Sequence, residues 1–254
     1  MGRVEGKVCL ITGGGAGLGR ADAMRLAEEG ARVVVTDVNR EGGEETAHLA
    51  SNGAIFLTQD VADEESWPRV LEQVRRHFGQ LNVLVNNAGI VVVKDVEATT
   101  TEEWRRVQSI MTDGVFFGLK YGIGLIKQNG EPGSIVNVSS TAALLGFPPY
   151  FAYSAAKGAV RSMTKSAAIH CQQSRYRIRV NSIHPGAIAT AMVAKATSEG
   201  GGTGAEEAGE GQPPGPGLGD PVDVANTVLF LASDESRFIN GAELVIDNGF
   251  TVSP

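Results

Sequence analysis

The chain has 254 residues and is 42% hydrophobic, which suits one large α/β domain with a full core. A net charge of −7 without any basic block argues against a nucleic-acid partner, and no apolar run is long enough to span a bilayer. The first residues do not form a secretion signal, the four histidines show no metal-ligand spacing, and Cys9 and Cys171 are expected to stay reduced, so we predict a cytoplasmic protein without a metal.

The first predicted element is a short apolar strand over residues 7–12, which runs into a glycine-rich loop at 13–19. A helix is predicted over 21–29, and Gly30 ends it. A glycine cluster alone is often only a flexible turn. Between a strand and a helix, however, it leaves room for a pyrophosphate against the backbone amides and the positive end of the helix. The predicted contacts in this loop are Gly13, Gly17, Leu18 and Gly19.

The second predicted strand, 32–37, ends in an acidic residue 18 positions after Gly19. A dinucleotide-binding fold places a carboxylate here to bind the adenosine ribose hydroxyls. Asp37 would repel a phosphate on that ribose, and neighbouring Val38 carries no compensating charge. These residues favour NAD over NADP, although Arg40 is close enough in sequence to oppose that preference.

A polar-faced helix is predicted over 41–50 and a third strand over 54–57. Asp60 and Val61 then fall where an adenine ring can rest, and the alternative is a surface turn followed by a core valine. An amphipathic helix is predicted over 64–78.

The next predicted strand, 81–85, ends in a polar turn with the sequence Asn-Asn-Ala-Gly at 86–89. Amide side chains and a glycine at a strand end can join neighbouring strands and leave the backbone close to a cofactor. We therefore expect cofactor contacts at Asn87, Ala88 and Gly89.

One long helix is predicted over 104–126, a strand over 135–138 and a further helix over 155–169. Tyr153 and Lys157 are four residues apart and so share one helix face. The lysine ammonium is expected to lower the phenol pKa from about 10, so that Tyr153 can exchange a proton with a substrate oxygen. Ser140, at the strand end, can donate a hydrogen bond to the same oxygen. Alone, this spacing also fits a packed tyrosine beside a snorkelling lysine.

The sixth predicted strand, 179–183, is broken by a His-Pro-Gly turn. The segment 205–220 is rich in Gly, Pro and Glu, and we predict a mobile stretch over about 191–219 that is either a solvated insertion or a substrate lid. A helix over 222–231 and a strand over 243–246 complete the chain. Alternating strands and helices predict an α/β fold over residues 1–254: a single doubly wound (Rossmann) parallel seven-stranded sheet with helices on both faces.

The order and spacing of these motifs resemble the short-chain dehydrogenase/reductase family over nearly the whole length. The resemblance rests on the glycine loop from Thr12 to Gly19, the 86–89 turn, and Ser140 placed 13 residues before Tyr153. It implies NAD(P)-dependent alcohol oxidation or carbonyl reduction. Tyr153 would transfer the proton, Lys157 would lower its pKa and bind the nicotinamide ribose, and Ser140, rather than Ser139, would hold the substrate oxygen. The residues that the resemblance assigns to the nicotinamide amide are Pro185, Ile188 and Thr190.

One position departs from the family pattern. Members usually carry an asparagine three residues before the Gly-Val-Phe turn of the long helix, and here that residue is Met111. The family asparagine is thought to complete a proton relay from the lysine to solvent, whereas a thioether is only a weak acceptor. Another group holds the water, or proton exchange is slower, or the enzyme is impaired; we expect activity to persist because the other three residues remain.

Within the family the chain looks most like NAD-dependent cyclic-alcohol and hydroxysteroid dehydrogenases. An apolar pocket formed by Phe147, the following prolines and Tyr150 fits a hydrophobic secondary alcohol or ketone, although simple loop packing explains this turn equally well. The alternatives are a 3-oxoacyl-type carbonyl reductase, which Asp37 and the net acidity oppose, and a non-catalytic NAD-binding regulatory protein. Family resemblance also implies a homotetramer.

Overall fold

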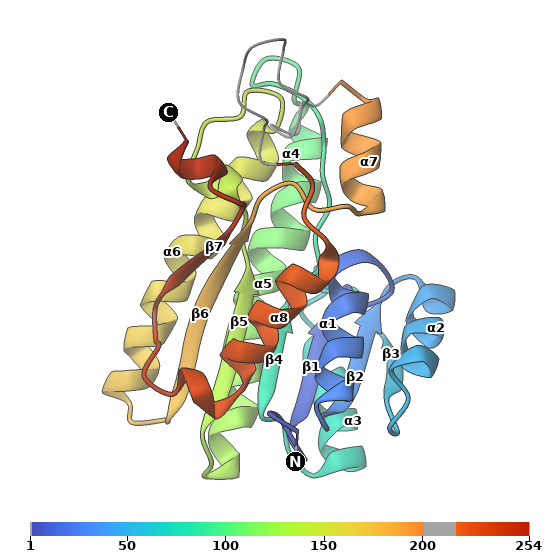
Figure 1. Cartoon of the computed structure of the whole chain (residues 1–254), viewed down its shortest axis with the longest axis vertical. Coiled ribbons are helices and arrows are strands. Elements are labelled where there is room, and N and C mark those ends of the chain that lie inside the picture. Colours follow the sequence, from blue (N-terminus) through green and yellow to red (C-terminus); the bar gives the residue numbers. More distant parts are fainter. Residues whose placement is uncertain (1, 201–216, 254) are drawn as a thin grey trace.

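The computed structural model describes residues 2–200 and 217–253, which form a seven-stranded parallel sheet flanked by helices (Figure 1). The strand order is β3-β2-β1-β4-β5-β6-β7, so the direction of winding reverses between β1 and β4. The strands are β1 (Val8–Thr12), β2 (Arg32–Asp37), β3 (Ile55–Thr58), β4 (Val83–Asn86), β5 (Gly133–Val138), β6 (Ile178–Pro185) and β7 (Glu243–Ile246). The predicted α/β fold, sheet and strand number are confirmed.

Helices cover both faces of this sheet, as Figure 1 shows. The α-helices are α1 (Gly17–Glu28), α2 (Arg40–Ala50), α3 (Ser66–Phe78), α4 (Thr101–Gln108), α5 (Gly114–Ile126), α6 (Phe151–Gln173), α7 (Ala191–Ser198) and α8 (Pro221–Ala232). The first helix begins at Gly17, earlier than the sequence predicted, because the end of the glycine loop is already helical.

The two faces of β1 show how the sheet separates two cores. Cys9 and Ile11 pack with α1 and α8 on one face. Val8 and Leu10 point the other way and pack with α3, α5 and α6. Side chains alternate along a strand, so a fully apolar strand such as β1 is buried on both sides. This double burial fixes the strand ends, and with them the loops that form the site.

The carboxyl ends of the parallel strands all lie at one end of the sheet, and side-chain amides join them there. The Asn87 amide donates to the carbonyl oxygens of Thr12 (2.9 Å) and Gly13 (3.0 Å), which joins the β4 end to the β1 end. The Asn86 amide donates to the Asn137 side-chain oxygen at 2.8 Å, between paired residues of β4 and β5. The predicted role of this turn in joining strands is confirmed.

The long helix predicted over 104–126 is interrupted in the structure. Helix α4 begins at Thr101, and a π-helical turn at Ser109–Asp113 separates it from α5. Such turns insert one extra residue into the helical ladder and often occur at functional sites. The buried Met111 lies in the middle of this turn.

The first part of the stretch predicted to be mobile, 191–219, is helical in the structure. Residues 191–198 form α7, whose first turn is capped by the Thr190 hydroxyl accepting from the Val193 amide. At the other end of the 191–219 stretch, the Gly219 amide donates to the Ala187 carbonyl oxygen, and the Ala189 amide donates to the Gly219 carbonyl oxygen. Residues 201–216 lie outside the described part of the chain, so the lid prediction there stays a prediction.

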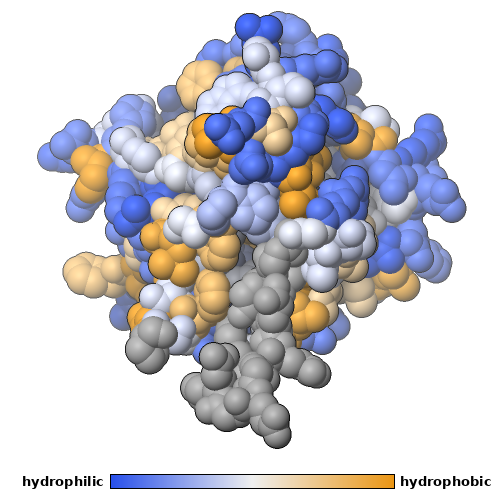
Figure 2. Space-filling model, turned by 90° about the horizontal axis from the view of Figure 1, so that it is seen from above, coloured by the Kyte–Doolittle hydropathy of each residue, from blue (hydrophilic) through white to orange (hydrophobic). Residues whose placement is uncertain are grey.

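Figure 2 views the molecule from above, at the end where α7 lies, and shows hydrophobic patches among hydrophilic ones. Over residues 2–200 and 217–253, no helix is long and apolar enough to cross a membrane. The same residues hold no cluster of histidine, cysteine, aspartate and glutamate suited to a metal, and both cysteines are free.

Candidate active site

A cleft of about 350 Å³ follows the carboxyl ends of the strands around the point where the winding reverses. Such a position is where doubly wound sheets bind their ligands. Of the residues that the sequence predicted for a cofactor, fifteen line it: Gly13, Gly17, Leu18, Asp37, Val38, Asp60, Val61, Asn87, Ala88, Gly89, Tyr153, Lys157, Pro185, Ile188 and Thr190. The structure therefore brings together residues that lie far apart in the sequence.

Gly19 is the predicted contact that does not line the cleft. A Cβ at this position would lie 2.5 Å from both the Asn87 amide nitrogen and the Gly13 carbonyl oxygen. Its glycine is required for the close packing of α1 against the strand ends rather than for a ligand. Gly17 differs, because its φ is +53° and a Cβ there would meet nothing closer than 3.5 Å. The space beside Gly17 is thus available to a phosphate at the start of α1.

The Asp37 carboxylate is held rigidly at the end of β2. One oxygen accepts from the Gly15 amide at 2.9 Å and the other from the Asn39 amide at 2.8 Å. Arg40 is exposed and forms an ion pair with Glu44 at 2.8 Å, so it does not neutralise Asp37 in this structure. The wall of the cleft formed by Asp37 therefore carries a negative charge that two backbone amides hold in place.

The residues of the cleft fit a nicotinamide dinucleotide. Gly17 leaves open space at the start of α1, the Asp37 carboxylate at the end of β2 can accept from ribose hydroxyls, and Lys157 lines the same cleft. Gln59, which the sequence analysis missed, also lines the cleft and is buried with both side-chain polar atoms unpartnered. A bound ligand with hydrogen-bonding groups would satisfy these atoms.

The two serines that follow β5 have different environments. Ser139 is buried, and its hydroxyl donates to the Lys157 carbonyl oxygen at 2.9 Å, which anchors α6. The Ser140 hydroxyl accepts from the Ala142 amide at 3.2 Å and lies 3.5 Å from the Pro185 carbonyl oxygen. Ser140 lines both this cleft and a second pocket. The geometry thus separates an anchoring serine from one that faces the site.

Lys157 and Tyr153 lie on one face of α6, as the spacing predicted, but the expected pKa effect is absent. The Lys157 ammonium donates to the Val138 carbonyl oxygen at 2.7 Å and lies 5.4 Å from the centre of the Tyr153 ring. Burial raises the pKa of Tyr153 above its ordinary value, although a hydrogen bond with the Ser140 side chain acts in the opposite direction. Burial also lowers the pKa of Lys157 to about 8. The prediction of a lowered phenol pKa is wrong for this state because desolvation has the largest effect on the phenol.

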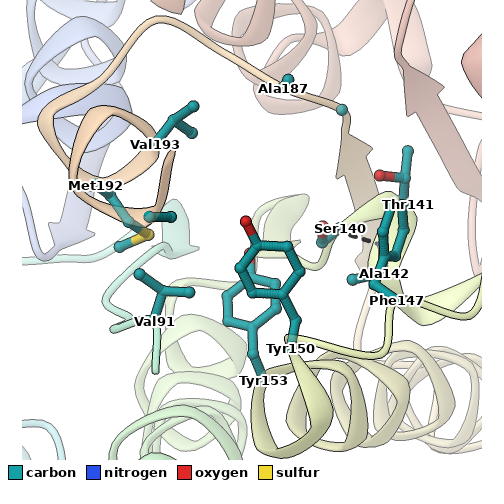
Figure 3. A pocket seen from close by; sticks show the side chains of 12 residues that line it. Val91, Ser140, Thr141, Ala142, Phe147, Tyr150, Tyr153, Ala187, Met192 and Val193 are labelled. Carbon is teal, nitrogen blue, oxygen red and sulfur yellow. Dashed lines mark hydrogen bonds between the residues drawn. The ribbon is translucent and has the colours of Figure 1, made fainter. Parts of the chain in front are cut away.

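A second, smaller pocket of about 100 Å³ adjoins the cleft at Ser140 and Tyr153. In Figure 3, Val91, Met192 and Val193 enter it from one side, with Ala142 and Phe147 on the other. The predicted substrate residues Phe147 and Tyr150 both line it. Apart from the Ser, Thr and Tyr hydroxyls, its walls are apolar, which suits a hydrophobic substrate with a single polar group.

Some residues of this pocket could not be read from the motifs. Met192 and Val193 come from α7, which the sequence analysis assigned to a mobile stretch. The Phe250 ring stacks on the ring of the lining residue Phe147, with centroids 5.9 Å apart. Its C-terminal 3-10 turn, Phe250–Val252, is 97 residues beyond Tyr153, so only the folded chain shows this contact.

Met111 lies beside the catalytic candidates. It is buried in a cluster with Val107 and Ala156, against which Tyr153 packs. A Cβ at Gly89 would lie 3.7 Å from the Met111 Cγ and 3.8 Å from the Lys157 Nζ, so both side chains approach the same point beside Gly89.

Comparisons with known proteins agree with this geometry. Residues 13–251 match a family model described as enoyl-(acyl carrier protein) reductase. Two curated relatives are the NADP-dependent (R)-specific alcohol dehydrogenase of Lentilactobacillus kefiri, 44% identical over 98% of each chain, and the 3-beta-hydroxysteroid dehydrogenase of Comamonas testosteroni, 40% identical over 97% of this chain and 96% of that protein. The chain belongs to the short-chain dehydrogenase/reductase family.

Further relatives support the same class. The cyclopentanol dehydrogenase of Comamonas testosteroni is 40% identical over the full length of both chains. The crystal structure of levodione reductase matches with a TM-score of 0.86 and 32% identity, covering 98% of this chain and 99% of that one. This family member is therefore an NAD(P)-dependent oxidoreductase of the alcohol dehydrogenase and ketoreductase class.

Proposed function

We propose that the protein is an NAD-dependent oxidoreductase that interconverts a hydrophobic secondary alcohol (cyclic, aryl or steroid) and its ketone. The observation that carries the proposal is that Ser140 and Tyr153 line both the cofactor-sized cleft and the apolar pocket. A ketone in the pocket would place its oxygen at these two side chains and its carbon toward the cleft. The similar alcohol, cyclopentanol and hydroxysteroid dehydrogenases support this substrate class.

The proposed roles follow from the contacts. During ketone reduction the Tyr153 phenol donates its proton to the substrate oxygen, and during alcohol oxidation it accepts that proton. Ser140 donates a hydrogen bond to the same oxygen, which stabilises the negative charge that develops there. Lys157, anchored on Val138, holds a positive charge next to the ring. When bound, the nicotinamide supplies or accepts the hydride.

A raised phenol pKa suits the reducing direction. Burial keeps Tyr153 protonated at neutral pH, and only the neutral phenol can act as the proton donor. Oxidation needs a proton acceptor, so it depends more strongly on Lys157 retaining its charge below a pKa of about 8. Tyr153 and Lys157 are thus proposed to favour ketone reduction over alcohol oxidation at neutral pH. Comparing the pH dependence of kcat in the two directions would measure this preference.

The proposal is tested by following NADH absorbance with cyclopentanol, 1-phenylethanol and a 3-hydroxysteroid, and in reverse with the matching ketones. We expect Tyr153→Phe to lower kcat by about 10²- to 10⁴-fold while calorimetry shows unchanged NAD binding. Tyr176→Phe is the matched control, because it removes the same hydroxyl from a residue that lines neither cavity of the site. A Tyr153→Phe protein that turns over at the parental rate would show that the chemistry is assigned wrongly.

Assembly and location remain part of the proposal. Within the described residues, strand β7 is paired on one side only, with β6, and its Val245 is 42% exposed. This edge supports the homotetramer that family resemblance implies, and sedimentation equilibrium would measure it. A cytoplasmic location is proposed from the sequence and would be tested by fractionation of the source cells.

A further inference from the structure

A basic cleft lies at the other end of the sheet from the candidate active site, where β5 and β6 begin. In Figure 1 this is the lower end, where α6 turns into β6 and the segment after α8 leads to β7. The cleft has a volume of about 780 Å³. Its basic lining residues, which define it, are Lys7, Arg175, Arg177, Arg179 and Arg237.

The charge of these residues is largely uncompensated. The chain as a whole is acidic, with 29 Asp and Glu against 22 Lys and Arg. Asp234 is nevertheless the single carboxylate among the described lining residues, and it already pairs with Lys7 at 2.6 Å. Arg175 and Arg237 are exposed and have no carboxylate within ion-pair distance in the described part of the chain. Several guanidinium groups therefore line one cavity, and Asp234, the carboxylate among the described lining residues, is already paired with Lys7.

Arg179 adds charge at the back of the basic cleft. One nitrogen of its guanidinium donates to the carbonyl oxygens of Leu231 (2.8 Å) and Ser233 (3.1 Å). The other terminal nitrogen, Nη1, is buried and has no partner. Neutral carbonyl groups orient this side chain without cancelling its charge, so the potential inside the cleft stays positive.

The backbone presents two of the arginines in an unusual conformation. Arg175 and Arg177, in the turn between α6 and β6, both have φ of +57°. This left-handed region is unfavourable for residues with a Cβ, and it persists only where the surrounding structure enforces it. Arg177 is held there by a hydrogen bond from its side chain to the Gly130 carbonyl oxygen at 3.2 Å. The turn thus places two arginines at the same cavity.

We propose that the basic cleft binds a small, multiply charged oxyanion of the phosphate or polycarboxylate type. Guanidinium forks match the paired oxygens of such groups, and several of them converge on one cavity here. The volume suits a small molecule, and the net charge of −7 opposes a long polyanion that would extend beyond the cleft. This site is separate from the proposed catalytic function and does not depend on it.

Calorimetry with inorganic pyrophosphate and, separately, with citrate tests the proposal at constant ionic strength. Saturating NAD is added first, because the glycine loop of the other cleft is itself a place for a pyrophosphate. We expect saturable binding of at least one probe, weakened as salt is raised because the guanidinium groups are partly solvated. The two probes distinguish phosphate from carboxylate chemistry. If neither pyrophosphate nor citrate binds saturably, the proposal is overturned.

A pair of double variants locates the binding. Arg175→Gln with Arg237→Gln removes two exposed charges from the basic cleft and breaks no described ion pair. Arg105→Gln with Arg106→Gln removes the same charge from exposed positions on α4 and is the matched control. We expect an affinity loss of about tenfold or more in the first protein and less than about twofold in the second. Equal losses of affinity in both proteins would show that binding depends only on net charge, and would overturn the assignment of the site to the basic cleft.

Discussion

The Nδ1 atom of the buried His184 lies 3.1 Å from the carbonyl oxygen of Ser140, a residue that lines both cavities of the site. A carbonyl oxygen only accepts, so Nδ1 carries the hydrogen and donates it. Burial lowers the pKa of His184, which favours the neutral ring, and its Nε2 then accepts from the Ser182 hydroxyl at 2.9 Å. The imidazole therefore ties the start of the Ser140 turn to β6.

We expect His184→Ala to lower kcat by about tenfold or more and to leave the KM for the cofactor nearly unchanged, because Ser140 loses its support while the glycine loop is untouched. His184→Asn should restore most of kcat, since its amide nitrogen can donate from nearly the position of Nδ1. Steady-state kinetics and thermal unfolding of both proteins provide the measurement. A His184→Ala protein that loses stability but keeps its kcat would show a purely structural histidine.

Asp37 makes cofactor preference testable. Its carboxylate is fixed by the Gly15 and Asn39 amides, and a phosphate on the adenosine ribose would lie against this charge. We expect kcat/KM to favour NAD over NADP by about 100-fold in the parent and by at least about tenfold less in Asp37→Asn. Asp63→Asn, the same change at a surface ion pair with Arg69, should leave the ratio unchanged.

The relative from Lentilactobacillus kefiri is named as NADP-dependent, so this experiment discriminates between two real possibilities. A parent protein that prefers NADP would contradict the role given to Asp37. It would point instead to Arg40 leaving Glu44 to meet the phosphate, and Glu44→Gln would then strengthen the NADP preference.

Met111 is the departure from the family pattern with a direct structural consequence. Its side chain, in a π-helical turn, approaches the same point beside Gly89 as the Lys157 ammonium, and an amide in its place would offer an acceptor there. We expect Met111→Asn to raise kcat or leave it unchanged and to move the pH at which activity changes upward, since an amide stabilises the charged lysine. Met111→Leu is the apolar control. A large loss of activity in the asparagine protein alone would show that proton exchange here follows another route.

The motifs of the site were predictable because each is local. A glycine loop between strand and helix, an acid at the end of the next strand, and Tyr153 one turn from Lys157 are visible as spacings. The parallel sheet then follows, because connections of this length bring the carboxyl ends of the strands to one end.

What spacing could not show were the effects of packing. Gly19 serves close contact with Asn87, and Phe250 reaches Phe147 from the far end of the chain. The shift of the phenol pKa was predicted with the wrong sign because burial, a tertiary property, has the largest effect on it. Helix α7 was within reach of the sequence, since Thr190 is a good N-cap before the helix-forming run Ala191–Ser198, but the following Gly-rich segment obscured it.

The buried charge of Lys157, which the proposed chemistry needs, lowers the free energy of unfolding. Its ordinary pKa is 10.5 and burial lowers it to about 8 in the folded protein. Between these values the unfolded chain binds a proton that the folded protein does not, so this group makes stability rise with pH from about 8 to about 10.5. Below pH 8 both states are charged, and the folded state bears the full penalty. Lys157→Met removes it, and even after the lost bond to Val138 we expect a gain of about 1–2 kcal/mol at pH 7 with activity abolished.

Urea unfolding of the parent and of Lys157→Met at pH 7, 8.5 and 10 checks this prediction. Other groups titrate in the same range, since burial raises the pKa of Cys9 to about 12 and of Cys171 to about 11. They are common to both proteins, so the difference between the two unfolding free energies isolates Lys157. That difference should shrink as pH rises from 8 to 10, because the parent sheds its penalty and the variant has none to lose. A difference that stays constant over this range would mean that Lys157 keeps an ordinary pKa, and that the positive charge assigned to the site persists well above pH 8.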